Sequence, residues 1–363
     1  MIFNRCASQP VIVFGPVPSG YFAMAGPEKS LKLIVLLILL TLTISPFAGA
    51  VTWKNCATEA STTGFPEKAL AIDINSTEMM LALGLGSRLA GVSAIYDRHN
   101  ILDIYRDDLD GVPVISVNYP TMNDIRESGA TFVVGGWNYG FSRGGRVTPE
   151  RLQDAGIGSY VLGESCHHAG DHRPVGIRQS LFPDLLTLGR IFGVGDKAAS
   201  LVDALEERLQ RVERKVAAFA SSEPVRIFVY DSGLPQPYTS GARSVINDVI
   251  RLAGGRSITG DLPVNWGMTT WDEVAARDPQ FIIIVDYGYS DGTMKARYLQ
   301  EHQALADTSA IRNNRLLIIP YSAAVTGVRS PGLADLLADQ LICEFHASTI
   351  SSSGEFSCSE RPF

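Results

Sequence analysis

Two polar turns, one in each half of the chain, carry side chains suited to holding a small molecule by hydrogen bonds. The first opens the segment 73–91 with Asp-Ile-Asn-Ser-Thr-Glu, and the second opens the segment 237–255 with Pro-Tyr-Thr-Ser-Gly. Each turn follows an apolar, strand-like run and places Asn, Ser or Thr where a helix is expected to begin. We therefore expect free backbone N–H groups and short hydroxyls to point outward there, toward a cleft shared by the two halves.

Aromatic side chains gather in loops that follow the predicted strands, which is where α/β sheets bind ligands. The glycine-rich loop 135–146 carries Trp137, Tyr139 and Arg143. Aromatic faces suit large planar or metal-chelate ligands, and arginines pair in bidentate fashion with carboxylate or phosphate groups. The candidate ligand-binding residues are Asn75, Tyr96, Trp137, Tyr139, Arg143, Tyr238, Trp266, Tyr287 and Arg329. The alternative is that several of these rings pack inside the lobes.

Strand-like and helical segments alternate through most of the chain, which predicts parallel sheets with helices on both faces. Strands are expected at residues 70–74, 89–95, 131–134, 157–162, 225–230, 281–285 and 316–319. Helices are expected at residues 77–83, 122–128, 149–155, 244–253, 270–277 and 330–345. The predicted fold class is α/β, with two Rossmann-like lobes of parallel sheets joined by one long α-helix and a ligand cleft between the lobes.

The expected boundaries follow from this alternation. After a polar lead at 51–66, we expect an N-terminal lobe at 67–182, a connecting helix at 183–222 with a break at Gly193-Val-Gly195, a C-terminal lobe at 223–346 and a loose tail at 347–363. Apolar residues of the connector keep helical spacing, while charged residues occupy its other face. Such a helix forms a rod of about 35 Å at 1.5 Å per residue. A coiled-coil partner is the alternative, but the run is shorter than four heptads.

The first 50 residues have the composition of a leader. Lys29 and Lys32 precede an uncharged apolar run at 33–44, and the small residues Ala48 and Ala50 follow. This order is typical of a cleaved secretory signal peptide, and the run is too short to span about 30 Å of bilayer as a helix. Met24 stands just before this pattern and is the expected start. We therefore expect export to the periplasm, with an uncleaved anchor as the alternative.

The exported part of the chain is acidic. Without residues 1–50, it holds 28 basic and 37 acidic residues, a formal net charge of −9. An acidic surface argues against nucleic acid or an anionic membrane as the main partner. The remaining 313 residues exceed one ordinary core and predict two domains.

Four cysteines remain after the leader: Cys56, Cys166, Cys343 and Cys358. An even number in an oxidising compartment predicts two disulfides, with three possible pairings. Cys343 and Cys358 are close in sequence and would fix the tail. Cys56 and Cys166 would then tie the N-terminal segment to the first lobe.

The order and spacing of three segments carry a family resemblance over nearly the whole exported chain. These segments are 237–255, 264–280 and the helix start Asn75-Ser-Thr-Glu78. The chain resembles the class III periplasmic substrate-binding proteins of ABC importers for vitamin B12, ferric siderophores and haem. The resemblance implies two α/β lobes joined by one long helix, which permits only small closure over a ligand in a shallow cleft.

In that family, a glutamate on each lobe typically docks onto arginines of the membrane permease. Asn123 and Asp272 align with those two acids, with Asp124 beside the first. The second lobe therefore keeps a carboxylate, while the first has lost its own unless Asp124 substitutes. The alternative is that these acids only favour the positive ends of their helices.

The function implied by the resemblance is capture of an iron chelate, corrinoid or similar bulky cofactor and its delivery to the importer's permease and ATPase. We expect a monomer that is not an enzyme and has no cofactor or metal of its own, carrying a ferric siderophore, haem or cobalamin. No nucleophile elbow, phosphate-binding loop or His-Glu-x-x-His helix is present in the sequence. The alternatives are a hydrolase or metal-binding enzyme on the same scaffold, or a binder of a metal-free cofactor such as a deazaflavin precursor.

Overall fold

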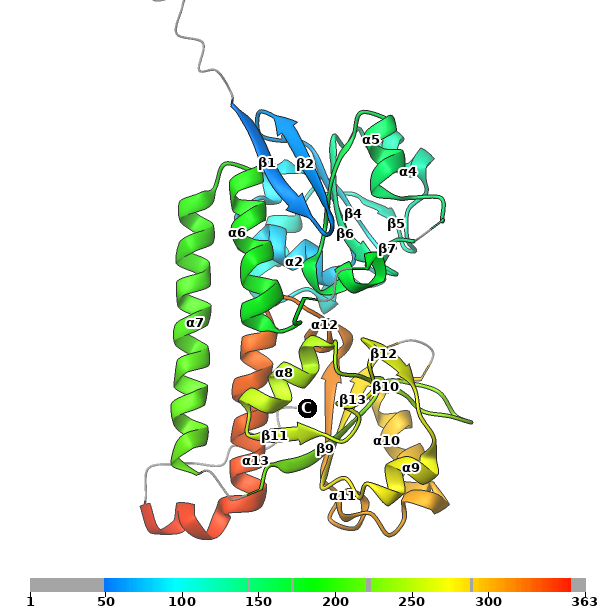
Figure 1. The fold of residues 1–363 in the computed structure, drawn as a ribbon, viewed down its shortest axis with the longest axis vertical. Helices are drawn as coiled ribbons and strands as arrows, with labels where there is room; N and C mark the ends of the chain where they lie inside the picture. The colour runs from blue at the N-terminus through cyan, green and yellow to red at the C-terminus, as the bar shows by residue number, and fades with distance from the viewer. Residues whose placement is uncertain (1–48, 143, 171–172, 220–222, 288–289, 354–363) are drawn as a thin grey trace, which may run out of the picture. The chain divides into compact units, whose positions relative to one another are not determined.

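The computed structural model describes residues 49–142, 144–170, 173–219, 223–287 and 290–353 (Figure 1). Residues 1–48 of the predicted leader, with Met24, lie outside this part of the chain, as do Arg143 and Cys358. Within the described residues, no helix combines the length and the apolar character needed to cross a bilayer.

The first lobe is built on a parallel sheet. Its strands are β3 (Ala69–Ile72), β4 (Leu89–Ser93), β5 (Val114–Ser116), β6 (Phe132–Trp137) and β8 (Gly158–Val161). The order is β5-β4-β3-β6, with β8 also paired to β6 and the short β7 (Gly140–Phe141) beside the end of β6. Every residue of β3 and β6 is buried, as expected of strands covered on both faces. The carboxyl ends of these parallel strands therefore share one edge.

Short helices lie between or after these strands, and side chains cap the starts of α2, α4 and α5. They are α2 (Ile74–Ala82), α3 (Asp103–Arg106), α4 (Met122–Glu127), α5 (Pro149–Asp154) and the 3₁₀ helix Gly163–Ala169. The hydroxyl of Thr148 accepts from the backbone N–H of Arg151, and Pro149 stands at the first helical position. The predicted start of α5 is confirmed.

The second lobe repeats this plan. Its parallel strands are β9 (Val225–Tyr230), β11 (Gly255–Ser257), β13 (Phe281–Asp286) and β14 (Leu316–Pro320), in the order β11-β9-β13-β14. A separate antiparallel pair is formed by β10 (Tyr238–Ser240) and β12 (Trp266–Met268). The helices are α8 (Val245–Leu252), α9 (Trp271–Ala276), α10 (Gly292–Glu301), α11 (Ser309–Arg312), α12 (Tyr321–Ala324) and α13 (Ser330–Ser353).

The expected connector is two helices, α6 (Phe182–Ile191) and α7 (Gly195–Ala218), with a turn at Gly193, whose φ is +70°. In Figure 1, α7 runs beside α6 and then beside α13, so it contacts a helix of each lobe. Ion pairs join α7 to α13 and to the helical turn Ile177–Leu181 that precedes α6. Arg178 of that turn donates to Glu213 at 2.7 Å, and Lys215 donates to Asp335 of α13 at 2.7 Å.

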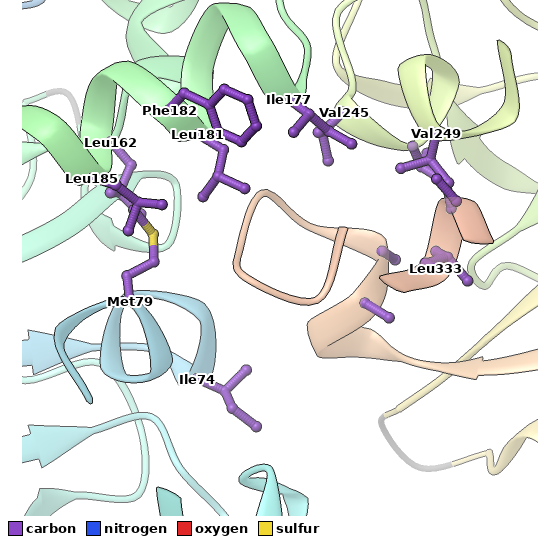
Figure 2. Close-up of a cluster of buried hydrophobic side chains, with 14 of the residues drawn as sticks. Ile74, Met79, Leu162, Ile177, Leu181, Phe182, Leu185, Val245, Val249 and Leu333 are labelled. Carbon is purple, nitrogen blue, oxygen red and sulfur yellow. The ribbon is translucent and has the colours of Figure 1, made fainter. Parts of the chain in front are cut away.

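A hydrophobic core continues from one lobe into the other. Figure 2 shows Met79 of α2 beside Leu185 of α6 and Val249 of α8 beside Leu333 of α13, with Leu181 between the two pairs in the same cluster. All five side chains are buried. Because burial of each such side chain contributes roughly 1.5–3 kcal/mol, the lobes are held together by packing as well as by α7.

These elements confirm the predicted fold class of parallel α/β lobes and one long helix. The polar lead differs from the prediction. Residues 50–63 form an antiparallel hairpin of β1 (Ala50–Asn55) and β2 (Thr58–Thr63). Its alternation of exposed and buried residues fits a hairpin with one covered face. The last helix continues to Ser353, with non-helical backbone at His346, where the sequence predicts its end.

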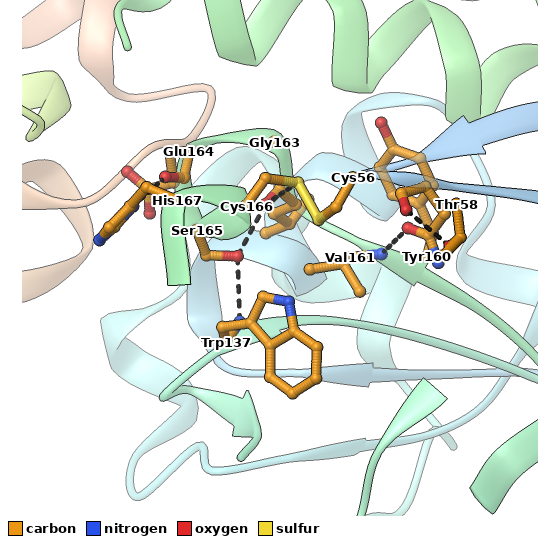
Figure 3. The surroundings of a disulfide bond; sticks show 12 residues. Cys56, Thr58, Trp137, Tyr160, Val161, Gly163, Glu164, Ser165, Cys166 and His167 are labelled. Carbon is orange, nitrogen blue, oxygen red and sulfur yellow. Dashed lines mark hydrogen bonds between the residues drawn. A yellow bond between two sulfur atoms is a disulfide. The ribbon is translucent and has the colours of Figure 1, made fainter. Parts of the chain in front are cut away.

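A disulfide fixes this hairpin to the first lobe. Cys56, in the turn between β1 and β2, is bonded to Cys166 of the 3₁₀ helix (Figure 3). Asn55 adds a hydrogen bond, because its Oδ1 accepts from the backbone N–H of Val161 at 2.8 Å. The predicted Cys56–Cys166 pairing is confirmed. The Cys343–Cys358 pairing stays a prediction, since Cys358 lies outside the described residues.

Replacing Cys56 and Cys166 together by serine is expected to lower the free energy of unfolding by about 2–4 kcal/mol. The bond joins residues 110 apart in sequence and so restricts the unfolded chain strongly. Urea unfolding of the double variant and the wild type, both under oxidising conditions, measures the difference. An unchanged midpoint and slope would show that the bond adds no stability.

Candidate functional site

Asp73 occupies the carboxyl end of β3 in an unusual backbone conformation. Its φ is +79°, a region that side chains rarely adopt, and it is only 4% exposed. One carboxylate oxygen accepts from the backbone N–H of Ile74 at 2.7 Å and caps α2. Strained non-glycine residues are concentrated at functional sites. The contacts of the other carboxylate oxygen of Asp73 therefore define the candidate site.

Tyrosines from both lobes reach this second oxygen. Tyr119, which follows β5, donates its hydroxyl to Asp73 Oδ2 at 3.3 Å, and Tyr321, which follows β14, donates at 3.4 Å. Burial raises the pKa of Asp73 to about 6, opposed by the hydrogen bonds from Ile74 and the two tyrosines. Asp73 is therefore mostly ionised at neutral pH and links the carboxyl ends of the two sheets.

A second tyrosine–carboxylate pair adjoins the first. The ring of Tyr287 lies 5.2 Å from that of Tyr321, and its hydroxyl donates to Asp231 Oδ2 at 2.8 Å. Burial raises the pKa of Asp231, against the opposing hydrogen bonds of Ser232 and Tyr287. We call Asp73, Tyr119, Asp231, Tyr287 and Tyr321 the tyrosine–aspartate cluster. Tyr119 and Tyr287 are 47% and 41% exposed, so a ligand can reach them.

Beside this cluster, the loop after α12 closes onto buried polar groups of the first lobe. The hydroxyl of Thr326 donates to Glu164, which also accepts from the hydroxyl of Tyr139 at 3.0 Å. Asn75 donates its amide to the Thr326 carbonyl at 3.0 Å. Burial raises the pKa of Glu164. Asn75 and Tyr139, both predicted ligand contacts, thus serve contacts within the protein in this structure.

Arg329, another predicted ligand contact, also makes its contacts within the protein. Its guanidinium pairs with Glu78 of α2, with Nε donating to Oε2 at 2.8 Å, and also donates to the Asn100 carbonyl. Glu78 is 1% exposed, so this pair neutralises a buried charge. In this structure the guanidinium of Arg329 is therefore not available to pair with a ligand carboxylate, contrary to the expectation.

The short polar residues of the two turns also face inward. The Ser76 hydroxyl donates to the Ile72 carbonyl at 2.6 Å, and the Thr77 hydroxyl donates to the Asp73 carbonyl at 2.9 Å. In the second turn, Thr239 and Ser240 are fully buried. The expectation of outward-pointing hydroxyls was wrong, because each turn lies directly beside the sheet that precedes it and its hydroxyls satisfy the local backbone.

Trp137 is a core residue rather than a wall of the site. It is 7% exposed and packs edge-on against Phe141, with 6.2 Å between ring centroids. Figure 3 shows its indole nitrogen on the side that faces Val161 and the disulfide. That nitrogen has no hydrogen-bond partner among the described residues. The predicted ligand contact at Trp137 is therefore corrected, because β6 continues to this residue and carries its ring into the lobe.

The remaining aromatic candidates stay accessible. Tyr238 and Trp266 are half-buried and stacked, with ring centroids 6.4 Å apart, on the antiparallel pair β10 and β12. Tyr96 is 77% exposed, and its hydroxyl donates to Asn118 at 3.4 Å. Arg143 lies outside the described residues. Tyr96, Tyr238, Trp266 and Tyr287 therefore remain as candidate contacts.

Two hollows in the surface lie away from the tyrosine–aspartate cluster. One, of about 520 Å³, is formed between Val51, Phe65 and the turn at Gly193. The other, of about 270 Å³, is formed over Cys56, Trp137 and Pro149. Neither is lined by a cluster residue. We place the candidate site at the cluster because polar and aromatic groups of both lobes converge there.

The expected docking residues lie at matching positions of two helices. Asn123 and Asp272 are exposed at the second positions of α4 and α9, after the capping residues Thr121 and Thr270. Asp124 accepts from the Thr121 backbone N–H at 2.7 Å as part of a capping box, which lowers its pKa. Asp124 therefore has a structural role already, while Asp272 is free to serve as a surface charge.

Four residues of the cluster were not predicted: Asp73, Tyr119, Asp231 and Tyr321. Asp73, Asp231 and Tyr321 each come directly after a strand, so a survey of the first residue beyond every apolar run would have found them. Tyr119 follows the three-residue strand β5, which was not predicted because Val-Ile-Ser is too short to stand out.

Comparisons with known proteins agree with this architecture. Residues 164–323 match the family model described as periplasmic binding protein. A solved periplasmic binding protein from Veillonella parvula is 24% identical, with a TM-score of 0.70 over 81% of this chain and 98% of that one. Over residues 164–323 the chain is similar to the periplasmic binding proteins, and its fold is similar to that of this solved structure.

Two further relatives support the relationship to periplasmic binding proteins. An uncharacterized ABC transporter substrate-binding lipoprotein of Bacillus subtilis, YvrC, is 18% identical over 251 residues, which are 69% of this chain and 72% of the relative. The structure titled as an ABC-type Fe3+-hydroxamate transport system from Saccharomonospora viridis is 19% identical, with a TM-score of 0.68 over 80% and 98% of the two chains. The family model and these relatives are named for binding or transport rather than for catalysis.

Metal ligands of the usual kinds do not assemble in the described part of the chain. No group of three or more His, Cys, Asp or Glu side chains there is placed to hold a metal ion. The run Cys166-His-His168 does not form such a group, because Cys166 is in the disulfide.

Replacing Asp73 by asparagine is expected to change how stability depends on pH. A carboxyl group whose pKa is raised from 3.8 to about 6 stabilises the folded state at low pH, and this contribution is lost as pH rises through 6. The stability of the wild type relative to the variant should fall by about 2 kcal/mol between pH 4 and pH 7.

Urea unfolding at several pH values measures this difference, and Asp272→Asn is the control because that side chain is exposed. Parallel pH profiles for the wild type and Asp73→Asn would contradict the assignment of a buried, perturbed carboxyl to Asp73.

Proposed function

We propose that this protein is an extracytoplasmic solute-binding protein that captures an iron chelate, corrinoid or similar bulky cofactor and delivers it to the permease of an ABC importer. The observation that carries the proposal is the convergence of tyrosines from both lobes on Asp73, at the carboxyl ends of two parallel sheets. That edge is where open α/β sheets bind ligands.

Exposed apolar side chains near these strand ends support a bulky ligand. In the first lobe, Tyr96, Val117 and Tyr119 are 77%, 54% and 47% exposed. In the second lobe, Tyr287, which follows β13, is 41% exposed, and Met268 of the antiparallel pair is 52% exposed. Soluble proteins rarely leave large apolar side chains clustered in water unless a partner covers them. A ligand with broad apolar or aromatic faces fits both groups.

The relatives support the class of cargo and its destination. One related structure is titled for Fe3+-hydroxamate transport, and the Bacillus subtilis relative is named as a substrate-binding lipoprotein of an ABC transporter. For this chain, we propose a periplasmic location after cleavage of the leader, action as a monomer, and release of the ligand chemically unchanged. Haem and cobalamin are the other candidate cargoes of the same size class.

A panel of ferric trihydroxamate, haemin and cyanocobalamin tests the proposal by thermal shift and calorimetry. A true ligand at 100 times its Kd should add about 2.7 kcal/mol to the free energy of unfolding. Trp266→Ala should weaken binding at least about tenfold, since it removes a half-buried indole face beside Tyr238. Leu186→Ala, an exposed position on α6, is the matched control.

Absence of binding by all three probes would contradict the proposed cargo class. Chemical conversion of a bound probe, detected by mass spectrometry after release, would favour the enzyme alternative instead.

For delivery, we propose that Asp272 is the permease-docking acid of the second lobe and that Asn123 presents only an amide on the first. Asn123 donates to Glu127 at 2.7 Å, so the matching surface of the first lobe still carries a carboxylate nearby. The two residues occupy equivalent exposed helix starts, which suits recognition by a permease with two similar halves.

Asp272→Arg should reduce uptake by the reconstituted importer about tenfold or more, because a reversed charge repels an arginine across the interface. Ligand affinity of the isolated protein should stay unchanged. Asp307→Arg, at another exposed position of the same lobe, controls for surface charge alone. Equal uptake by the wild type and Asp272→Arg would remove this docking assignment.

A further inference from the structure

The direction of the hydrogen bonds in the tyrosine–aspartate cluster limits what the cluster can offer a ligand. An ionised carboxylate only accepts hydrogen bonds. The hydroxyl protons of Tyr119 and Tyr321 are therefore directed at Asp73, and that of Tyr287 is directed at Asp231. Each phenol oxygen has one proton, and all three protons are engaged within the protein.

Each phenol oxygen can still accept hydrogen bonds through its lone pairs. Tyr119 and Tyr287 are the members that a ligand can approach, since both are more than 40% exposed. A ligand group that needs a donor, such as a carboxylate, finds none on these hydroxyls without breaking a bond to Asp73 or Asp231. A ligand group that donates finds two acceptors already oriented.

The surrounding charges also favour a ligand group that donates hydrogen bonds or carries a positive charge. Asp73, Asp231 and Glu164 bring three carboxyl groups to this region, and Asp73 and Glu164 interact electrostatically. The ammonium of Lys295 lies 4.6 Å from the centre of the Tyr287 ring and donates to the Val285 carbonyl at 2.7 Å. The charge of Lys295 also lowers the pKa of Asp231 and so offsets that carboxylate, whereas Asp73 has only neutral partners among the described contacts.

The basic group closest along the loop after α12 does not alter this balance. Arg329 is committed to Glu78, whose buried carboxylate it neutralises. The side of the cluster nearest Asp73 thus keeps a local negative potential, together with phenol oxygens that act as acceptors.

We propose that the tyrosine–aspartate cluster selects a ligand that turns hydrogen-bond donors or a cationic group toward Tyr119 and Tyr287, and that it disfavours a carboxylate at that position. This inference rests on the proposed function, because it assigns the cluster to the cargo. The inference restricts the proposed ligands from bulky chelates in general to chelates with a positively charged or hydrogen-bond-donating face.

Matched chelates test the selectivity. Ferrioxamine B carries an ammonium group on a ferric trihydroxamate, and its N-succinyl derivative replaces the ammonium by an amide-linked arm that ends in a carboxylate. The wild type should bind the ammonium form about tenfold or more tightly, as expected for a full charge near one partly screened carboxylate. Asp73→Asn, which removes the charge of that carboxylate, should lose most of this preference, and the double variant Tyr119→Phe/Tyr287→Phe should weaken it because it removes both phenol acceptors.

Tyr298→Phe is the control, because it removes a tyrosine hydroxyl of the same lobe that donates to the Leu234 carbonyl outside the cluster. It should keep the preference of the wild type. Equal binding of the two chelates by the wild type, or tighter binding of the carboxylate form, would overturn the inference while leaving the proposed function intact.

A second probe, terbium(III) alone, separates the inference from the proposed function. Terbium prefers oxygen ligands and luminesces when a nearby tyrosine transfers energy to it. The wild type should show saturable sensitised luminescence, weakened at least about fivefold in apparent affinity by Tyr119→Phe/Tyr287→Phe and unchanged by Tyr298→Phe.

The chelate experiment and the terbium experiment can give negative results independently of each other. If no chelate of the panel binds but the apparent affinity for terbium falls in the double variant, the proposed cargo is contradicted and the acceptor character of the cluster is supported. If a chelate binds but the apparent affinity for terbium is the same in the wild type and the double variant, the inference is overturned and the proposed function stands.

Discussion

A buried carboxylate needs partners, and much of the contact between the two lobes follows from that constraint. Asp73, Glu78 and Glu164 of the first lobe are each at most 4% exposed. The second lobe supplies a partner to every one of them, through Tyr321, Arg329 and Thr326 respectively. Because an unpaired buried charge costs several kcal/mol, these contacts fix how the loop after α12 meets α2. The packing in Figure 2 holds the same two lobes together on the side of α6 and α8.

Most of the fold could be predicted because its signals are local. The continuous apolar runs of β9 and β13 predict strands buried on both faces, and the observed bounds differ from the predicted ones by one residue at most. The turn at Gly193, between α6 and α7, was visible as a glycine pair. The hairpin β1–β2 was missed, because most of its exposed residues are Thr or other polar residues and resemble a polar loop.

The site was predicted less well, because its residues are defined by partners far away in sequence. Loop position alone selected Trp137 and Arg329, yet one ring lies in a core and the other side chain is held by Glu78, 251 residues away. Tyr287 was found because it follows a strong strand. Asp73 was read as part of a helix start, and its tyrosine partners from two lobes could not be seen without the sheet order.

Hydrogen–deuterium exchange with and without a bound ferric chelate tests the central claim most directly, since it reports which backbone segments a ligand covers. If the cargo lies across both lobes at the tyrosine–aspartate cluster, protection should rise together in peptides that contain Tyr119 and in peptides that contain Asp231 or Tyr287. Protection confined to one lobe, or centred on the hollow beside the Cys56–Cys166 bond, would contradict it.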